Sequence, residues 1–368
     1  MNTLEALLSL NLIPQIGSVR LENLLKYFQK PEAIFKASRK DLSAVLGEKL
    51  GESIASFDVK RLERDLTLAR KSNLKIITFF DKNYPPALKE IPGFPIVLYV
   101  LGDITADDDL AIGIVGSRRA SFYGLSSAEK FAAELSIQGI TIVSGMARGV
   151  DTCAHRGALK VGGRTIAVMG SGFSHIYPPE NEDLAKKISL SGAVISEFPM
   201  ETEPLPHNFP RRNRLISGLS LGILITEAAR NSGALITADF ALEQGREVFA
   251  LPGRIDSNGS TGANALLKQG AKLVTCCQDI LEEMNLIKSE TKKQENLVNK
   301  QAAACGKDEG MLYDCIGQQA VAIDELIEKT SLSSSQVLSL ILKLQFKKLI
   351  KELPGKQFMR IIGGSVNE

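Results

Sequence analysis

The sequence predicts an α/β protein whose central domain is a doubly wound parallel sheet, with a helical domain before it and a winged helix after it. Three patterns along the 368 residues support this prediction. The first segment shows only helical periodicity, the middle alternates short apolar runs with amphipathic stretches, and the end has three short amphipathic stretches before two strand-like runs. Fully apolar strands spaced by helices are typical of a parallel sheet that is covered on both faces.

Residues 1–73 are predicted to be an all-helical domain. Its expected helices are 4–12, 19–28, 31–37, 40–46 and a long amphipathic helix at 52–72. Glycine-containing turns at 13–18 and 45–51 separate these helices in the manner of SAM-like or helix-hairpin-helix units. Such a turn can present backbone N–H groups to a DNA phosphate, although a glycine between two helices is more often a plain C-cap.

Residues 74–286 are predicted to form the central domain. Strand-like runs at 75–80 and 96–101 flank a proline-rich loop. Strands at 111–115, 141–144, 165–169, 193–196, 222–226, 247–250 and 272–274 then alternate with helices at 121–138, 152–161, 181–191, 212–219, 234–244 and 263–269. This alternation predicts a Rossmann-like fold, in which ligands bind at the carboxyl ends of the strands.

Residues 287–308 are polar and are predicted to be a linker, followed by a winged helix at 309–364. Its expected helices are 311–316, 323–329 and 335–346, and two strands flank a turn at Pro354 and Gly355. In the last helix the predicted core residues are Val337, Leu338, Leu340, Ile341, Leu342 and Leu344, which leaves Ser334, Gln336, Ser339 and Lys343 outward. The wing is basic, and it could contact the backbone of a DNA duplex, contact a protein partner or simply be solvated. Its basic residues are Lys347, Lys348, Lys351, Lys356 and Arg360.

Composition excludes several classes of protein. The formal net charge is only +2, so any nucleic-acid binding must come from the local placement of arginines. Five cysteines without C-x-x-C spacing predict reduced, mostly buried thiols, and three histidines without an H-E-x-x-H motif give no metal site. Because no apolar run reaches membrane-spanning length and no signal peptide is evident, we expect a cytoplasmic protein without membrane contact.

Four glycine or serine turns follow predicted strands of the central domain. They contain Gly116, Ser117 and Arg118, then Ser144 and Gly145, then Gly170 and Gly172, and finally Ser232 and Gly233. Parallel strands bring such turns to one edge of the sheet, where backbone N–H groups and helix N-termini can approach an anion. Arginines beside the turns predict that the anion is a phosphate; they are Arg118, Arg148, Arg212 and Arg214.

The segment 209–216 places three arginines and Asn213 at the start of a helix, directly after Phe209. Positive charges at a helix N-terminus oppose the helix dipole, so the pattern predicts an anion nearby. Phe209 could stack on a nucleic-acid base or be a core residue beside solvated arginines. Asn213 could cap the helix or contact a sugar-phosphate.

Catalytic patterns are weak. There is no P-loop, the dinucleotide fingerprint lacks its third glycine, and Ser144 lacks the flanking residues of a nucleophile elbow. His155 is expected to cap or pack within its helix. Glu197 and Glu227, at strand ends, are the candidate acids, although either could instead hydrogen-bond loop amides or arginines.

Seven blocks in chain order resemble the DNA-processing protein A (DprA/Smf) family of bacteria. They lie at 115–118, 143–155, 165–170, 177–178, 195–199, 209–214 and 232–238. The resemblance spans about residues 75–280, and the flanking domains match in outline. It implies a non-catalytic protein without a cofactor that binds single-stranded DNA, protects it during natural transformation and loads the RecA recombinase onto it, commonly as a homodimer.

The resemblance also implies roles for particular residues. Arg118 would contact a DNA phosphate, while Ser144, Gly145, Gly170 and Gly172 would line the pocket floor. Phe209, Asn213 and Arg214 would form its wall. Together with the turns, the expected DNA-binding set is Gly116, Ser117, Arg118, Ser144, Gly145, Arg148, Gly170, Gly172, Phe209, Arg212, Asn213, Arg214, Ser232 and Gly233. Family members often place a lysine just before this phenylalanine, whereas this chain has Pro206, His207 and Asn208.

Two rival functions come from other classes. Cytokinin-activating phosphoribohydrolases are Rossmann-like enzymes that act on nucleoside monophosphates with a P-G-G-x-G-T turn, but the corresponding segment 226–234 lacks the double glycine. A winged-helix regulator that senses a nucleotide would instead bind duplex DNA of a defined sequence.

Overall fold

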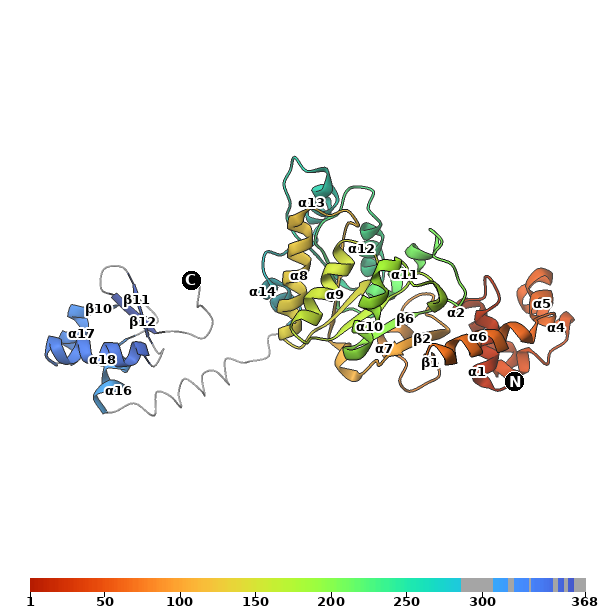
Figure 1. The fold of residues 1–368 in the computed structure, drawn as a ribbon, viewed down its shortest axis with the longest axis horizontal. Helices are drawn as coiled ribbons and strands as arrows, with labels where there is room; N and C mark the ends of the chain where they lie inside the picture. Colours follow the sequence, from red (N-terminus) through yellow and green to blue (C-terminus); the bar gives the residue numbers. More distant parts are fainter. Residues whose placement is uncertain (286–306, 317–320, 331, 347–349, 354–356, 361–368) are drawn as a thin grey trace. The chain divides into compact units, whose positions relative to one another are not determined.

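The computed structural model describes residues 1–285, 307–316, 321–330, 332–346, 350–353 and 357–360. The chain divides into two compact units, Met1–Met284 and Asn285–Glu368, which are described separately (Figure 1). The N-terminal helices and the central sheet both belong to the first unit. Most of the predicted linker lies outside the described residues, and the domain boundaries proposed above stay predictions.

The N-terminal part is all helical, as predicted. It contains α1 (Thr3–Asn11), α2 (Ser18–Phe28), α3 (Pro31–Ile34), α4 (Arg39–Leu46), α5 (Glu48–Ala55) and α6 (Val59–Lys71). The predicted single helix at 52–72 is wrong, because the side chain of Asp58 accepts a hydrogen bond from Lys60 N and starts a new helix. The second predicted turn is also too long. Only Gly47 separates α4 from α5, and Gly51 lies inside α5, where a Cβ atom would meet Ser43 Oγ at 2.5 Å.

The central sheet has nine strands and is mostly parallel, which confirms the predicted fold class. They are β1 (Lys75–Thr78), β2 (Val97–Gly102), β3 (Ala111–Val115), β4 (Thr141–Gly145), β5 (Thr165–Val168), β6 (Ala193–Ser196), β7 (Gly222–Ile225), β8 (Glu247–Ala250) and β9 (Lys272–Leu273). Their order is β1-β2-β6-β5-β4-β3-β7-β8-β9. Strand β2 pairs antiparallel with β1 and β6, and the other neighbours are parallel.

The helices between the strands mostly match their predicted positions. They are α7 (Pro86–Lys89), α8 (Phe122–Ile137), α9 (Val150–Lys160), α10 (Glu182–Ser191), α11 (Asn208–Gly218), α12 (Gly233–Glu243), α13 (Thr261–Lys268) and α14 (Cys277–Glu283). Helices α7 and α14 were not predicted. Helix α11 starts four residues before its predicted start, because Pro210 lies in the first turn, where its missing N–H has no intrahelical partner to lose.

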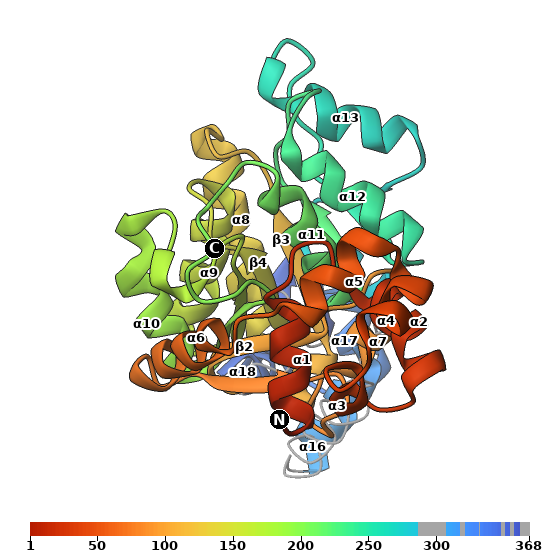
Figure 2. The ribbon, with the colours of Figure 1, turned by 90° about the vertical axis from the view of Figure 1, so that its right-hand side faces the viewer.

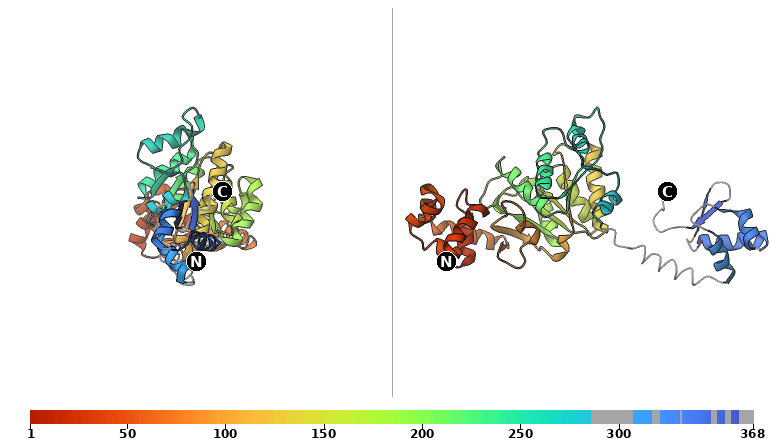
Figure 3. Two further views of the ribbon diagram at one scale, coloured as in Figure 1. Left: turned by 90° about the vertical axis from the view of Figure 1, so that its left-hand side faces the viewer. Right: turned by 180° about the vertical axis from the view of Figure 1, so that it is seen from behind.

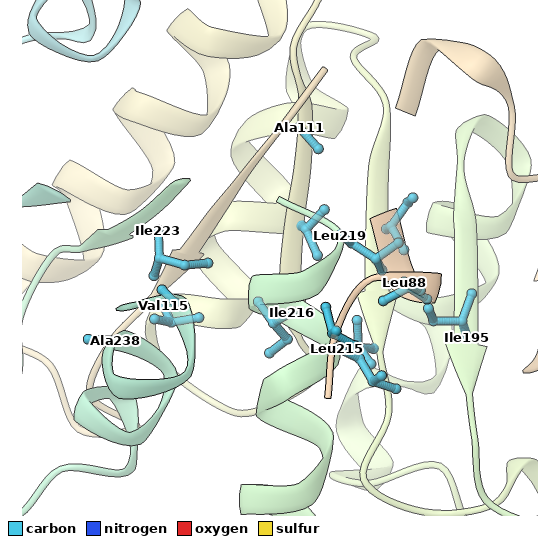
Figure 4. Close-up of a cluster of buried hydrophobic side chains, with 14 of the residues drawn as sticks. Leu88, Ala111, Val115, Ile195, Leu215, Ile216, Leu219, Ile223 and Ala238 are labelled. Atoms are coloured by element: carbon cyan, nitrogen blue, oxygen red, sulfur yellow. The ribbon is translucent and has the colours of Figure 1, made fainter. Parts of the chain in front are cut away.

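Both faces of the sheet are covered by helices (Figures 2 and 3). On β2, Leu98 and Val100 join one hydrophobic cluster, whereas Val97 and Tyr99 join another, as expected for side chains that alternate across a strand. The first cluster includes residues of α7, α11 and α12, and the second includes residues of α1, α6 and α10. Figure 4 shows α11 residues of the first cluster, Leu215 and Ile216.

A buried carboxylate ties the N-terminal helices to the sheet. Asp65 of α6 accepts hydrogen bonds from Tyr99 Oη at 2.6 Å and from Met200 N at 2.8 Å. Burial raises the pKa of Asp65, although both hydrogen bonds oppose that shift. Asn11 Nδ2 also donates to Glu197 O at 3.1 Å. The helices and the Rossmann-like part are therefore held together by specific polar contacts.

The second unit has the winged-helix elements that were predicted. These are α16 (Lys307–Cys315), β10 (Val321–Ala322), α17 (Ile323–Thr330), α18 (Ser334–Phe346), β11 (Ile350–Leu353) and β12 (Gln357–Arg360), with sheet order β10-β12-β11. Strand β10 was not predicted, and the turn at Pro354 and Gly355 lies outside the described residues, as do Lys347, Lys348 and Lys356.

The predicted core face of α18 is partly wrong. Val337, Ile341 and Leu344 are buried, but Leu338 and Leu342 are 48% and 55% exposed. Positions i, i+4 and i+7 share one stripe of a helix, and the two exposed leucines lie on the neighbouring stripe.

The cysteine prediction is also partly wrong. Cys153, Cys276, Cys277 and Cys315 are free thiols, but Cys276 is exposed and the others are half-buried, whereas we predicted mostly buried thiols. Cys276 immediately precedes α14, at the surface end of a helix. Cys305 lies outside the described residues.

Candidate functional site

A cleft opens where the strand order reverses. From β3 the chain runs outward through β4, β5 and β6, and it then returns to β7 on the other side of β3. The connections after β3 and β7 therefore diverge, which makes this edge the expected ligand site of a doubly wound sheet. A cavity of about 430 Å³ lies there. It is lined by Gly116, Ser117, Arg118, Arg119, Asp151, Phe209, Arg212, Asn213, Ser232 and Gly233, among others.

Arg118 and Arg119 are exposed cations of this cleft, and Arg118 is the one that contacts Phe209. Its guanidinium carbon lies 4.9 Å from the ring centroid of Phe209, and it forms no ion pair with any described residue. The half-buried Phe209 ring rests on Gly170, where a Cβ atom would lie 2.8 Å from the ring. Tyr177 supports the same ring at 5.8 Å between centroids. The aromatic platform thus orients the Arg118 fork while leaving its donors free.

A buried charge cluster lies beneath the platform. Arg212 is 4% exposed; its Nη1 donates to Val168 O and its Nε to Asn213 Oδ1. Asp151, 6% exposed, accepts a hydrogen bond from Ala147 N at 3.2 Å. Desolvation raises the pKa of Asp151 and lowers the pKa of Arg212, and the interaction between the two opposes both shifts. The Arg212 guanidinium is therefore a buried positive charge beneath the cleft floor.

Gly145 makes room for this cluster. A Cβ atom there would lie 2.3 Å from both Arg212 Nη1 and Asp151 Oδ2, so only glycine fits beside the two charges. Ser144 is fully buried as well, and its hydroxyl donates to Ile114 O at 2.6 Å. Both residues shape the floor from below and do not line the cavity.

The protein itself supplies anions for two of the arginines in α11. Arg214 forms an ion pair with Glu197, and Arg212 interacts with Asp151. Arg211 instead stacks over the Phe198 ring at 5.2 Å. The anion that the sequence pattern predicts near these arginines is thus supplied, for Arg212 and Arg214, by carboxylates of the protein itself.

Asn213 links two helices. Its Nδ2 donates to Gly233 O at 3.2 Å and its Oδ1 accepts from Arg212, so of the two alternatives given above, the helix cap is wrong and the sugar-phosphate contact stays untested. The side chain faces α12 because Asn213 lies in the second turn of α11, beyond the reach of the first amides.

Fewer turn amides are available than the sequence suggested. Ser117 N donates to Glu227 O at 2.8 Å, and Arg119 N donates to Ser117 Oγ at 3.1 Å. The Glu227 carboxylate accepts hydrogen bonds from Ser121 N and Oγ at the start of α8. Both candidate acids therefore make structural contacts: Glu227 accepts hydrogen bonds from Ser121, and Glu197 pairs with Arg214. This was the alternative to an acid role, namely that these glutamates bind loop amides or arginines.

The N-terminus of α12 forms the opposite wall of the cleft. Ser232 caps the helix by accepting a hydrogen bond from Ala234 N at 3.3 Å. Gly233 is exposed, and nothing lies within 4 Å of its Cβ position. The positive end of the helix dipole thus faces Arg118 and Arg212 across an open space that suits an anion.

Six predicted residues do not line the cleft: Ser144, Gly145 and Gly170 lie beneath it, and Gly172, Arg148 and Arg214 lie elsewhere. Gly172 packs against backbone, with Pro199 O 2.0 Å from its Cβ position. Arg148 is exposed, forms an ion pair with Glu180 and lies over Tyr177 at 5.8 Å. Arg214 lines a different and larger cavity. Asp151 was missed, because nothing in the segment around it distinguishes a buried carboxylate from a helix-start aspartate.

His155 was expected to cap or pack within its helix, but its partners lie on β4 and β5, where it supports the same turn. It is fully buried, and its ring nitrogens lie 2.7 Å from Thr165 Oγ1 and 2.7 Å from Gly145 O. Desolvation lowers the pKa of His155 to about 4, with the hydrogen bond to Gly145 opposing and Arg212 adding to the shift. The ring is therefore neutral at pH 7, and its Nε2–H donates to the Gly145 carbonyl.

We expect the stability of the first unit to decrease between pH 6.5 and pH 4. In this window the unfolded chain protonates His155 whereas the folded protein does not, so the free energy of unfolding should fall by about 3 kcal/mol. Denaturant titrations of the wild type and of His155→Gln across this range measure the effect. The glutamine amide can still donate to Gly145 O, so the variant should show a smaller pH dependence; an identical profile would contradict the assignment.

Gly170→Ala should weaken the cleft by moving Phe209. The new methyl group would push the ring and the Arg118 guanidinium above it, costing about 1 kcal/mol of stability and several-fold in affinity for an anionic ligand. Thermal melting and ligand titration test this. Adding Phe209→Leu should restore the melting temperature without restoring affinity, since the clash is relieved but the platform is lost.

Within the described parts of the chain, no helix has the length and hydropathy needed to cross a membrane. No group of three histidine, cysteine, aspartate or glutamate side chains in those parts is placed to hold a metal ion.

Fold and cleft together define a Rossmann-like protein with a cationic crevice at the switch point of its sheet, followed by a winged helix. The family model for DNA recombination-mediator protein A matches residues 75–285, and the model for the DprA winged helix domain matches residues 299–356. The chain belongs to the DNA recombination-mediator protein A (DprA) family, which confirms the resemblance noted in the sequence.

Relatives and solved structures agree with this membership. Protein Smf of Escherichia coli is 39% identical over 305 residues, covering 82% of this chain and 81% of that protein. DNA processing protein DprA of Bacillus subtilis is 43% identical over 225 residues, covering 61% and 76%. The structure of DprA from Streptococcus pneumoniae matches with a TM-score of 0.66 at 33% identity, covering 77% of this chain and 98% of that one.

A further structure, DprA from Helicobacter pylori, is described in terms of its single-stranded DNA binding mode. It matches with a TM-score of 0.52 at 32% identity, covering 58% of this chain and 97% of that one.

Proposed function

We propose that this protein binds single-stranded DNA in the cleft between the connections after β3 and β7. The observation that carries the proposal is Arg118, an exposed guanidinium that is stacked on Phe209 and has no carboxylate partner among the described residues. Arg212 and the N-terminus of α12 add positive potential around the same space. The Helicobacter pylori relative that is described as binding single-stranded DNA supports the choice of ligand.

The geometry favours binding without sequence preference. The side chains of Arg212 and Asn213 hydrogen-bond to other protein groups, so neither is free to contact the edge of a base. Arg118 can contact a phosphate with its donors, and the exposed face of its guanidinium plane can stack on a base. Contacts to phosphates and stacking surfaces position a strand but carry little sequence information.

A titration across salt concentration tests the proposal. Binding of a random-sequence single strand should weaken with salt with a log–log slope of about −0.7 per phosphate contact. A duplex of the same sequence should compete poorly, because paired bases cannot stack on the arginine. Equal competition by duplex, or binding that depends on one sequence, would favour a winged-helix regulator instead.

Within the family we further propose a place in natural transformation. The protein would act in the cytoplasm as a homodimer, protect incoming single strands and load the RecA recombinase onto them. Its membership in the DNA recombination-mediator family supports a role in DNA processing. Sedimentation tests the dimer, nuclease digestion of the bound strand tests protection, and RecA filament assembly with and without the protein tests loading.

We expect no nucleotide hydrolysis. The glutamate that would act as an acid in the rival hydrolase, Glu227, is held by Ser121 N and Oγ. Incubation with AMP should therefore release no free adenine above the buffer control. Adenine release that disappears in Glu227→Gln would overturn the proposal that the protein is not an enzyme.

A further inference from the structure

The first unit contains a second and larger cavity of about 1050 Å³. It lies where the turn between α1 and α2 faces the loop after β6 and the start of α11. The glycine-containing turn at 13–18 was noted in the sequence as a possible phosphate-binding hairpin. The structure places that turn in the wall of this cavity together with arginines of α2, α6 and α11.

The carboxylates of this cavity each have a partner within the protein. Glu197 pairs with Arg214 through Oε2, although its buried Oε1 has no hydrogen-bond partner, and Glu201 pairs with Arg64 at 2.5 Å. Asp65 accepts hydrogen bonds from Tyr99 and Met200, as described above. Arg211 is exposed, stacks on Phe198 and forms no ion pair with a described carboxylate, so its charge is available to a ligand.

The N-terminus of α2 opens into the same cavity. Gly17 precedes this eleven-residue helix and has no side chain to cap it, so the first-turn amides of Ser18, Val19 and Arg20 have no side-chain acceptor. Ser18 is only 3% exposed, yet its hydroxyl has no hydrogen-bond partner. Uncapped amides, an unpartnered buried hydroxyl and a positive dipole end together suit a phosphate group.

One segment of chain lines both cavities. Phe209 and Arg212 line the cleft described above, whereas Asn208 and Arg211 line the second cavity. These residues alternate along the start of α11, so its two sides face different cavities. A strand that leaves the cleft over the N-terminal end of α11 can reach the second cavity along this one helix.

We propose that the second cavity binds a backbone phosphate of the same single strand, held by the α2 amides, Ser18 and Arg211. This inference rests on the proposed function, since it extends the path of the strand. Free phosphate or a mononucleotide offers the same chemical group, so the test must separate a strand from these smaller anions.

Gly17→Asp tests the site without harming the fold. Nothing lies within 4 Å of the Gly17 Cβ position, its φ of −117° suits any residue, and aspartate is a favoured N-cap. The melting temperature should therefore stay the same or rise. A strand of about sixteen nucleotides should bind about tenfold more weakly, with a salt slope reduced by about 0.7, while one of about five nucleotides should bind unchanged.

Two further variants separate charge from shape. Gly17→Asn caps α2 without a negative charge and should lose less affinity for the long strand than Gly17→Asp. Arg211→Ala should also weaken only the long strand, and it removes no ion pair. Long-strand binding that is intact in both Gly17→Asp and Arg211→Ala would overturn the second site and leave the proposed function standing.

The remaining outcomes are also decisive. If the wild type binds neither strand, the proposed function itself fails. If inorganic phosphate or AMP binds saturably to the wild type and not to Gly17→Asp, while long strands bind both proteins equally, the cavity holds a small anion and the strand path is wrong. If Gly17→Asp and Arg211→Ala lose affinity for the long strand, and AMP competes only weakly with that strand for the wild type, the proposed path of the strand from the cleft to the second cavity is supported.

Discussion

Arg118→Ala should lower the affinity for single-stranded DNA by roughly thirtyfold, equivalent to about 2 kcal/mol. The guanidinium is the only exposed cation of the cleft that stacks on Phe209 within the described chain, and it forms no ion pair there. The buried Asp151, which Arg118 also stabilises, keeps its stronger interaction with Arg212. The melting temperature should therefore remain nearly constant. A fluorescence titration at several salt concentrations measures the affinity, and the slope should fall by about 0.7 for the lost phosphate contact.

Two controls sharpen this result. Arg156→Ala removes another exposed arginine, on α9 and away from both cavities, and should leave binding unchanged. Arg118→Lys keeps the charge but not the planar fork, so it should recover only part of the affinity. Wild-type affinity for single-stranded DNA in Arg118→Ala, or an equal loss of affinity in Arg156→Ala, would show that the cleft does not hold the strand.

Much of the fold follows from local patterns. Buried parallel strands are continuous apolar runs, so β6 (Ala193–Ser196) and β8 (Glu247–Ala250) begin and end where the sequence predicts. The convergence of the four turns follows from the parallel order alone. The break before α6 could not be predicted in the same way, because the helical period continues through it. The only side-chain cap at the break is Asp58, which starts α6 after α5 has ended at Ala55.

The partners of the site residues are harder to predict from sequence. Glu227 meets Ser121 across 106 positions of the chain, and Asn213 meets Gly233 across 20. Such contacts depend on how helices pack on the sheet, which periodicity does not report. For the same reason the sequence grouped Arg214 with Arg118, although α11 directs Arg214 into a different cavity from the one that Arg118 lines.

Arg212→Met should destabilise the first unit by about 3 kcal/mol at pH 7 and also weaken DNA binding. The change removes the stronger of the two arginine charges that stabilise the buried Asp151 carboxylate, leaving only Arg118, and burial already raises the pKa of that carboxyl group. The folded variant then holds a proton that the unfolded chain releases, so the loss of stability should be smaller at pH 5 than at pH 7.

A double-mutant cycle tests the origin of this loss. Asp151→Asn keeps a side-chain oxygen that can accept from Ala147 N but removes the charge. In Arg212→Met with Asp151→Asn, no buried carboxylate remains beneath the cleft, so much of the stability should return and the pH dependence of the single variant should disappear. DNA affinity should stay low in the double variant, because the cation under the cleft is still missing. Strictly additive losses of stability would mean that Arg212 acts through its hydrogen bonds to Val168 and Asn213, and the charge cluster would then have no part in holding the cleft together.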